Sequence, residues 1–185
     1  MDYAELYIDA HKTPDYRLSN QGIDCMDVWF KKLPTATAGK SFLEVGCGNG
    51  LLCKRMLKHF KTVTGIDVVD GGYDRTGYEF KVVDISRTIC FGEYDYAVCF
   101  DVLEHLRESD ALVALKTICL SAKTVILTAA CYAGPPMHLT TKTPGWWLDM
   151  CFELCPDFNW EVLKVWNRYQ HSSPVILLYG VAKEN

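Results

Sequence analysis

The chain has 185 residues, of which 49% are hydrophobic and 23% are charged, so its composition excludes a mainly disordered protein. A chain of this length can bury about 70% of its unfolded surface in one core, and we expect a single domain, residues 1–185. The net charge of -4 argues against sequence-independent binding to a phosphate backbone, which depends on clustered Lys and Arg.

Nine cysteines occur along the chain, and no two of them are spaced as Cys-x-x-Cys. Most fall inside apolar runs, which indicates reduced thiols of a cytoplasmic protein rather than disulfides or a zinc site. The first twelve residues lack the basic start and apolar middle of a secretory signal, and no apolar run is long enough for a membrane span. We therefore expect a soluble, cytoplasmic protein with no membrane partner.

Short β-branched runs alternate with helical patterns from residue 40 onward, which is typical of a parallel sheet covered by helices. The patterns predict, in chain order, a strand at 40–45, a helix at 50–60, strands at 61–67, 78–85 and 94–100, a helix at 109–120 and a strand at 123–130. The links that precede the third and fourth strands are too short for ordinary crossover helices. We therefore expect helices there to be abbreviated or absent.

Two further strand patterns, at 159–170 and 174–183, are separated only by "HSS". Such a short link cannot hold a crossover helix, so these two strands should pair as an antiparallel hairpin. Between the fifth strand and this hairpin, "WWLDMCFELC" fits a helix that packs on the core. The predicted fold class is therefore α/β, with a mostly parallel seven-stranded sheet that ends in a C-terminal antiparallel hairpin.

The stretch "FLEVGCGNG" places three glycines, Gly46, Gly48 and Gly50, directly after the first predicted strand. A turn without side chains lets a ligand approach the backbone closely. The dinucleotide fingerprint G-x-G-x-x-G would require glycine where Leu51 stands, so a pyrophosphate is not the obvious ligand. Asp67 closes the second strand 21 residues after Gly46, at the place where a carboxylate accepts hydrogen bonds from ribose hydroxyls. The pattern predicts a bound nucleoside, and the alternative is a plain turn.

These residues resemble the class I S-adenosylmethionine-dependent methyltransferases, which have a Rossmann-like fold. The similarity lies in "LEVGCGNG", "GID", "KVVDI" and "YDYAVCFDVLEHL", which follow in the right order, and in the terminal hairpin. The resemblance implies S-adenosyl-L-methionine as cofactor. It also implies the following cofactor-binding residues: Glu44, Gly46, Cys47, Gly48, Asn49, Gly50, Asp67, Asp84, Ile85 and Asp101.

The resemblance further implies a role for each part of this site. Glu44 would face the charged amino group of the methionine part, and Asp67 would hold the ribose. Asp84 would bind the adenine amino group with Ile85 against the ring face, and Asp101 would lie near the methionine end. Carboxylates suit a cationic sulfonium better than a phosphate-binding loop would. The alternative for Asp84 is that it only caps the turn after its strand.

Two histidines are the predicted catalytic residues, because methyl transfer to a hydroxyl or amine releases a proton that a base can accept. His105 follows the fourth strand and His138 follows the fifth, at the edge where open α/β sheets place their ligands. The alternatives are that His105 only packs against or caps the next helix and that His138 is a surface loop residue.

A metal site is a further alternative at the same place. The residues Asp101, Glu104, His105 and His138 resemble the Glu-x-x-Glu-His cluster, with a distant His, of methyltransferases that act on the terminal ribose of small RNAs, and such ligands suit Mg²⁺ or Mn²⁺. In this chain Asp101 replaces the first glutamate of that pattern, and similar sequences occur in relatives without metal. We therefore assign no metal ligand.

The sequence thus predicts a methyltransferase whose partner is a small-molecule acceptor with a reactive oxygen or nitrogen atom. The alternatives are an RNA or nucleic-acid methyltransferase, with metal-assisted ribose 2'-O-methylation as one form, and a non-catalytic cofactor-binding module. We expect an N-terminal helical segment at 1–38, the cofactor-binding core at 39–130, a lid on the acceptor side at 131–157 and the terminal hairpin at 158–185.

Overall fold

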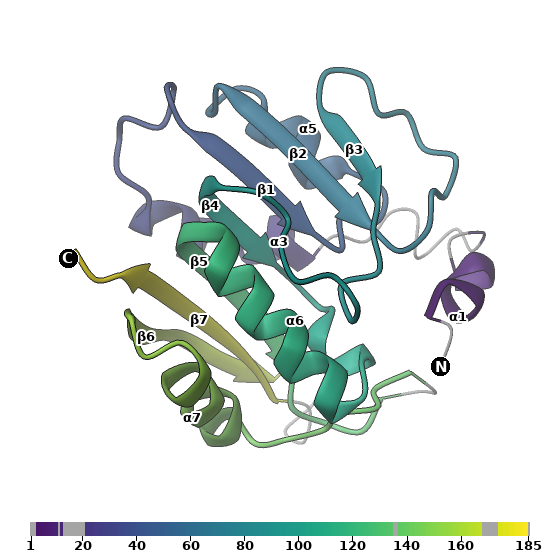
Figure 1. Ribbon diagram of the computed structural model, residues 1–185, viewed down its shortest axis with the longest axis vertical. Helices are drawn as coiled ribbons and strands as arrows, with labels where there is room; N and C mark the ends of the chain where they lie inside the picture. The colour runs from purple at the N-terminus through teal and green to yellow at the C-terminus, as the bar shows by residue number, and fades with distance from the viewer. Residues whose placement is uncertain (1–2, 11, 13–20, 135–136, 168–173, 185) are drawn as a thin grey trace.

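One sheet of seven strands organises the computed structural model, which describes residues 3–10, 12, 21–134, 137–167 and 174–184. The strand order is β3-β2-β1-β4-β5-β7-β6 (Figure 1). The strands are β1 (Ser41–Val45), β2 (Thr62–Asp67), β3 (Glu79–Val82), β4 (Tyr94–Cys99), β5 (Ala122–Ala130), β6 (Phe158–Asn167) and β7 (Pro174–Ala182). The first five strands pair in parallel, and β7 is antiparallel to both β5 and β6. The predicted α/β sheet and its terminal hairpin are confirmed.

Helices cover both faces of this sheet. They are α1 (Tyr3–Ala10), α3 (Gln21–Asp24), α4 (Met26–Trp29), η1 (Phe30–Lys32), α5 (Leu51–Met56), η2 (Leu103–His105), α6 (Glu108–Ser121) and α7 (Pro144–Leu154). In Figure 1, α6 and α7 lie in front of the sheet and α5 lies behind it. The links 68–78 and 83–93 contain no helix, which confirms that the helices expected there are missing. Within the described ranges, no helix is both long and apolar enough to cross a membrane.

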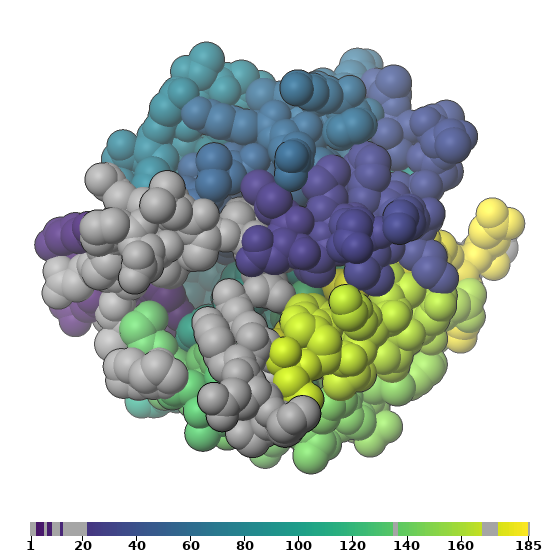
Figure 2. Space-filling view, turned by 180° about the vertical axis from the view of Figure 1, so that it is seen from behind, coloured from purple at the N-terminus to yellow at the C-terminus, as the bar shows by residue number. Residues whose placement is uncertain are grey.

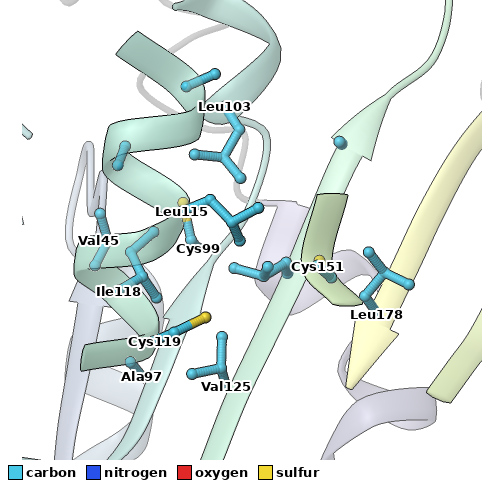
Figure 3. Packing of buried hydrophobic residues seen from close by; sticks show 14 of the residues in the cluster. Val45, Ala97, Cys99, Leu103, Leu115, Ile118, Cys119, Val125, Cys151 and Leu178 are labelled. Carbon is cyan, nitrogen blue, oxygen red and sulfur yellow. The ribbon is translucent and has the colours of Figure 1, made fainter. Parts of the chain in front are cut away.

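Neighbouring residues of the central strands enter different hydrophobic clusters, as the two-residue period of a strand dictates. In β1, Leu43 packs in the cluster on the side of α6 and α7, whereas Phe42 packs in the cluster around α4 and α5. Figure 3 shows the first cluster, where Leu115 and Ile118 of α6 meet residues of β4 and β5. The core therefore consists of two layers with the sheet between them.

Two elements are shorter than the sequence predicted. The helix expected at 50–60 ends at Met56, because the next residues form a turn in which the His59 amide donates to the Met56 carbonyl at 2.9 Å. This turn brings Phe60 onto the sheet, with its ring centroid 4.8 Å from that of Phe42. The strand expected at 78–85 ends at Val82, because Asp84 forms a turn with the residues that follow it.

The segment from α3 to η1 packs across the back of the molecule. Figure 2 shows this dark blue and purple segment between the blue region of α5 and the yellow-green strand β6. Trp29 of α4 is fully buried, and its indole nitrogen donates a hydrogen bond to the Gly22 carbonyl at 2.9 Å. An exposed ion pair between Lys32 and Glu161, 2.8 Å apart, joins η1 to β6. The segment thus completes the second core layer.

Strand β3 forms one edge of the sheet and is poorly covered. Glu79, Lys81 and Val82 are exposed, because neither neighbouring link supplies a helix to lie over them. The side chains of Lys81 and Glu79 form an ion pair at 3.2 Å. The edge strand β3 therefore presents charged groups to solvent.

Replacing Leu115 with alanine should lower the free energy of unfolding by about 2–5 kcal/mol, because this side chain is fully buried between α6 and the sheet. Urea unfolding followed by circular dichroism measures the change. Val113→Ala is the matched control, since Val113 lies on the same helix with 43% of its surface exposed, and it should change stability by about 0.5 kcal/mol or less. Equal losses in both variants would contradict this description of the core.

Candidate active site

The glycine turn after β1 adopts a backbone that only glycine enters without strain. The φ angles of Gly46, Gly48 and Gly50 are 72°, 49° and 73°. A β-carbon at Gly46 would overlap the side chain of Val102, and one at Gly50 would overlap the hydroxyl of Tyr78. These glycines are therefore required by the turn itself, and they also leave its backbone open to a ligand.

Two buried carboxylates shape this turn from inside. Asp67, at the end of β2, accepts a hydrogen bond from the Gly48 amide at 2.7 Å and one from the Val69 amide at 3.3 Å. Glu44 of β1 accepts hydrogen bonds from the Cys53 amide and the Cys53 thiol, both at 2.9 Å. Because Cys53 lies in the first turn of α5, Glu44 also places negative charge at the positive end of that helix.

A cavity of about 930 Å³, including its opening to solvent, lies at the carboxyl edge of the parallel strands. It is lined by Tyr3, Tyr7, Gly22, Glu44, Gly46, Cys47, Gly48, Asn49, Asp67, Val68, Asp84, Ile85, Phe100, Asp101, Val102, His105 and Leu106. The structure thus brings nearly all of the site residues expected from the sequence together in one place. Gly50 and His138 are the two that do not line it.

Asp84 combines the two roles considered from the sequence, because it caps a turn and also lines the cavity. Its carboxylate accepts hydrogen bonds from the Ser86 amide at 3.0 Å and the Ser86 hydroxyl at 2.6 Å, so it does cap the turn after β3. It also lines the cavity beside Ile85, whose side chain is buried. Capping the turn and facing a ligand are therefore compatible here.

Helix α1 supplies cavity residues that the sequence did not single out as ligands, Tyr3 and Tyr7. The Tyr3 hydroxyl donates a hydrogen bond to the Asp110 carboxylate at 2.5 Å and accepts one from the Arg107 amide at 3.0 Å. These contacts fix α1 to the start of α6, and Figure 1 shows α1 at the edge towards which the parallel strands point. The aromatic residues at the start of the chain were the available signal, but the hydrogen-bond partners of Tyr3 lie more than a hundred positions away.

Asp101, which is partly buried and lines the cavity, forms an acidic pair with Glu104. Asp101 is the one non-glycine residue in the described ranges with a left-handed φ, 59°, and its amide donates to the Thr128 hydroxyl at 2.9 Å. Glu104 is fully buried and accepts a hydrogen bond from the Ala130 amide at 2.7 Å. Burial and the neighbouring charge of Asp101 raise the pKa of Glu104 well above its usual value, which favours the protonated form.

His105 and His138 lie together, with ring centroids 4.9 Å apart. Nδ1 of His105 is 3.0 Å from the Met137 carbonyl oxygen, and Nδ1 of His138 is 2.9 Å from the Tyr132 carbonyl oxygen. A carbonyl oxygen only accepts, so Nδ1 carries the hydrogen in both neutral rings and Nε2 carries the lone pair. His105 lines the cavity, which makes it the histidine that a bound acceptor would meet.

One cluster in the described ranges could hold a metal ion. Ligand atoms of Glu104, His105 and His138 lie within 4.8 Å of one another, and Asp101 is not part of this group. One Glu104 oxygen, Oε2, is buried and has no hydrogen-bond partner among the described residues, so it would gain from a cation. Two imidazoles and a carboxylate are donors that divalent first-row metals accept.

Known proteins with similar sequences and folds agree with this geometry. A family model described as a methyltransferase domain matches residues 25–168. The ubiquinone biosynthesis O-methyltransferase of Bordetella avium (strain 197N) is 29% identical over 96 residues, which cover 46% of this chain and 40% of that protein. The same enzyme of Shewanella pealeana is 31% identical over 86 residues, 40% of this chain and 36% of that protein. The match therefore spans less than half of the length of these curated relatives.

Among solved structures, the N-methyltransferase NodS from Bradyrhizobium japonicum WM9, in complex with S-adenosyl-L-homocysteine, has a TM-score of 0.70 at 14% identity, with 100% of each chain covered. That likeness concerns the fold. Because the family model covers more than half of the chain and the fold agrees with it, the chain belongs to the class I S-adenosylmethionine-dependent methyltransferases.

Proposed function

We propose that this protein transfers a methyl group from S-adenosylmethionine to a hydroxyl group of a small molecule, with His105 as general base. The observation that carries the proposal is that His105 lines the same cavity as the glycine turn and Asp67. In this proposal the backbone of Gly46–Gly50 would hold the methionine part of the cofactor, Asp67 would hold its ribose, and Asp84 and Ile85 would hold its adenine. The acceptor then occupies the part of the cavity near His105.

The reaction is an in-line displacement at the methyl carbon of the sulfonium. The acceptor oxygen would form a bond to this carbon while the carbon–sulfur bond breaks. The electron pair of the carbon–sulfur bond would stay on sulfur, which gives neutral S-adenosylhomocysteine. The hydroxyl proton passes to Nε2 of His105, which carries the lone pair because Nδ1 faces the Met137 carbonyl. The protein therefore contributes alignment, exclusion of water and one base.

Oxygen is preferred over nitrogen as acceptor because the curated relatives that match are named O-methyltransferases. A small molecule is preferred over nucleic acid because three surface lysines that could contact a phosphate backbone pair with carboxylates instead. Lys32 pairs with Glu161, Lys40 with Asp95 and Lys54 with Asp74. The positive charge available to a phosphate backbone is reduced accordingly.

Formation of S-adenosylhomocysteine from S-adenosylmethionine tests the proposal directly. A panel of phenols and catechols, matched aryl amines and a short RNA would each be incubated with the enzyme, and the product quantified by mass spectrometry. We expect turnover with hydroxyl acceptors. A protein that binds S-adenosylhomocysteine tightly but methylates nothing in the panel or in a metabolite extract would instead be a binding module.

A second candidate, metal-assisted methyl transfer, is favoured by the proximity of Glu104, His105 and His138. A divalent ion held there would polarise the acceptor hydroxyl as a Lewis acid. Because the raised pKa of Glu104 disfavours the ionised ligand, we expect EDTA to leave the rate of S-adenosylhomocysteine formation within about twofold. A loss of tenfold or more that Mn²⁺ restores would establish the metal-assisted reaction, and Mg²⁺ addition would show whether the ion is specific.

A further inference from the structure

The link between β2 and β3, residues 68–78, contains no helix and folds back against the glycine turn. Arg75 and Tyr78 contact the glycine turn after β1, and the ring of Tyr73 lies against Arg75. None of these three side chains lines the cavity, so they do not meet the ligand directly. The link therefore packs against the glycine turn on the side away from the cavity.

Arg75 makes the central contacts of this support. Its Nη1 donates a hydrogen bond to the Gly48 carbonyl at 3.0 Å and another to the Tyr78 hydroxyl at 2.8 Å. The guanidinium lies over the ring of Phe80, 3.9 Å from its centroid, and only 14% of the side chain is exposed. A planar cation stacked in this way has little freedom to leave the Gly48 carbonyl.

Tyr78 closes the support beneath Gly50. Its hydroxyl occupies the space that a β-carbon at Gly50 would need, so the ring packs directly against the backbone of the turn. Burial raises the pKa of Tyr78 to about 12, so the hydroxyl stays uncharged near the carboxylates of the site. Arg75 and Tyr78 together fill the volume behind the turn.

The Gly48 residue is consequently held on both sides. Its amide donates to Asp67, a residue of the cavity wall, and its carbonyl accepts from Arg75, which lies outside the cavity. Glycine has more backbone freedom than any other residue type, and the φ of 49° at Gly48 uses that freedom. Without these contacts the turn would sample many conformations. Fixing it before the cofactor arrives reduces the entropy lost on binding.

We infer that Arg75 is a positioning residue for S-adenosylmethionine, which acts through the Gly48 carbonyl and with Tyr78 preorganises the glycine turn. The inference rests on the cofactor position proposed above. Arg75 touches neither the cofactor nor the acceptor in this arrangement. Its loss should weaken cofactor binding and leave the chemical step unchanged once the cofactor is bound.

Arg75→Gln is the first test, with S-adenosylhomocysteine as the probe in isothermal titration calorimetry. We expect the dissociation constant to rise about tenfold, because a hydrogen bond from a charged donor is lost. Arg75→Lys keeps the charge and one donor, so it should recover part of the affinity. Tyr78→Phe removes only the hydroxyl and should weaken binding by a smaller factor. This milder variant tests the same contacts if the arginine variants fail to fold.

Lys54→Met is the matched control. Lys54 forms an ion pair at 2.5 Å with Asp74, which neighbours Arg75, but this pair is exposed to solvent. Breaking it should change the dissociation constant by less than about twofold, since exposed pairs contribute little. Hydrogen exchange gives a second readout, because faster exchange in Arg75→Gln should be confined to residues 46–50 and their contacts.

Two outcomes would overturn the inference. One is an Arg75→Gln variant that binds S-adenosylhomocysteine within twofold of the parent. The other is a variant whose affinity falls together with its melting temperature, with exchange faster throughout the sheet and no recovery in Arg75→Lys. Failure of the proposed function looks different, since a parent that binds the probe but methylates no acceptor would leave the role of Arg75 intact.

Discussion

Replacing Asp67 with alanine should raise the dissociation constant for S-adenosylhomocysteine about 100-fold, the largest binding effect that we expect. The change removes the acceptor of the Gly48 and Val69 amides and leaves both donors unpaired, and it also removes the carboxylate proposed to hold the ribose. A factor of 100 corresponds to about 2.7 kcal/mol, within reach of these combined losses. Isothermal titration calorimetry measures it, and urea unfolding shows whether the fold is retained.

Gly48→Leu supports the same conclusion by a different route. A branched side chain at a φ of 49° strains the turn and projects into the cavity, so binding should weaken by a similar factor. Gly92→Ala is the control, because Gly92 also has a positive φ, 107°, but does not line the cavity. If Asp67→Ala and Gly48→Leu both bind the cofactor product as tightly as the parent, the proposed cofactor site is misplaced.

Replacing His105 with glutamine should lower kcat by about 100- to 1,000-fold, because a positioned general base usually contributes about 100- to 10,000-fold. Affinity for S-adenosylhomocysteine should change little, because the proposed cofactor contacts come from the glycine turn and the strand-end carboxylates. Initial rates of S-adenosylhomocysteine formation at saturating S-adenosylmethionine and acceptor give kcat for the parent and the variant.

His59→Gln provides the control for His105. His59 packs against the ring of Phe30, with centroids 4.7 Å apart, and it does not line the cavity. The same substitution there should leave kcat unchanged. A His105 variant with full activity would contradict the role of general base and would leave the proton to solvent or to the acceptor itself.

The sheet and the glycine turn could be predicted because their signals are local. Alternating apolar residues, the spacing of the glycines and an aspartate after each strand all lie within short windows of sequence. The end of α5 could not be predicted in this way. It depends on Phe60 finding a place against Phe42, a contact between separate elements that the helical period does not encode.

The candidate site shows the same division. Residues in recognisable strand-end positions, such as Asp67 and Asp84, do line the cavity. Tyr3 and Arg75 were missed, because Tyr3 bonds to residues more than a hundred positions away and Arg75 bonds to the Gly48 carbonyl from a link without periodicity. Sequence patterns report which residues share an element, whereas these two contacts arise only when distant elements meet.

The two links without helices, residues 68–78 and 83–93, affect whether copies of the molecule can associate through the sheet. They leave β3 as an uncovered sheet border whose unpaired backbone groups could add a strand from another chain. Glu79 and Lys81 place charges along this border, and an incoming strand would have to strip water from both. The two charges thus disfavour strand addition at this border and work against self-association through β3.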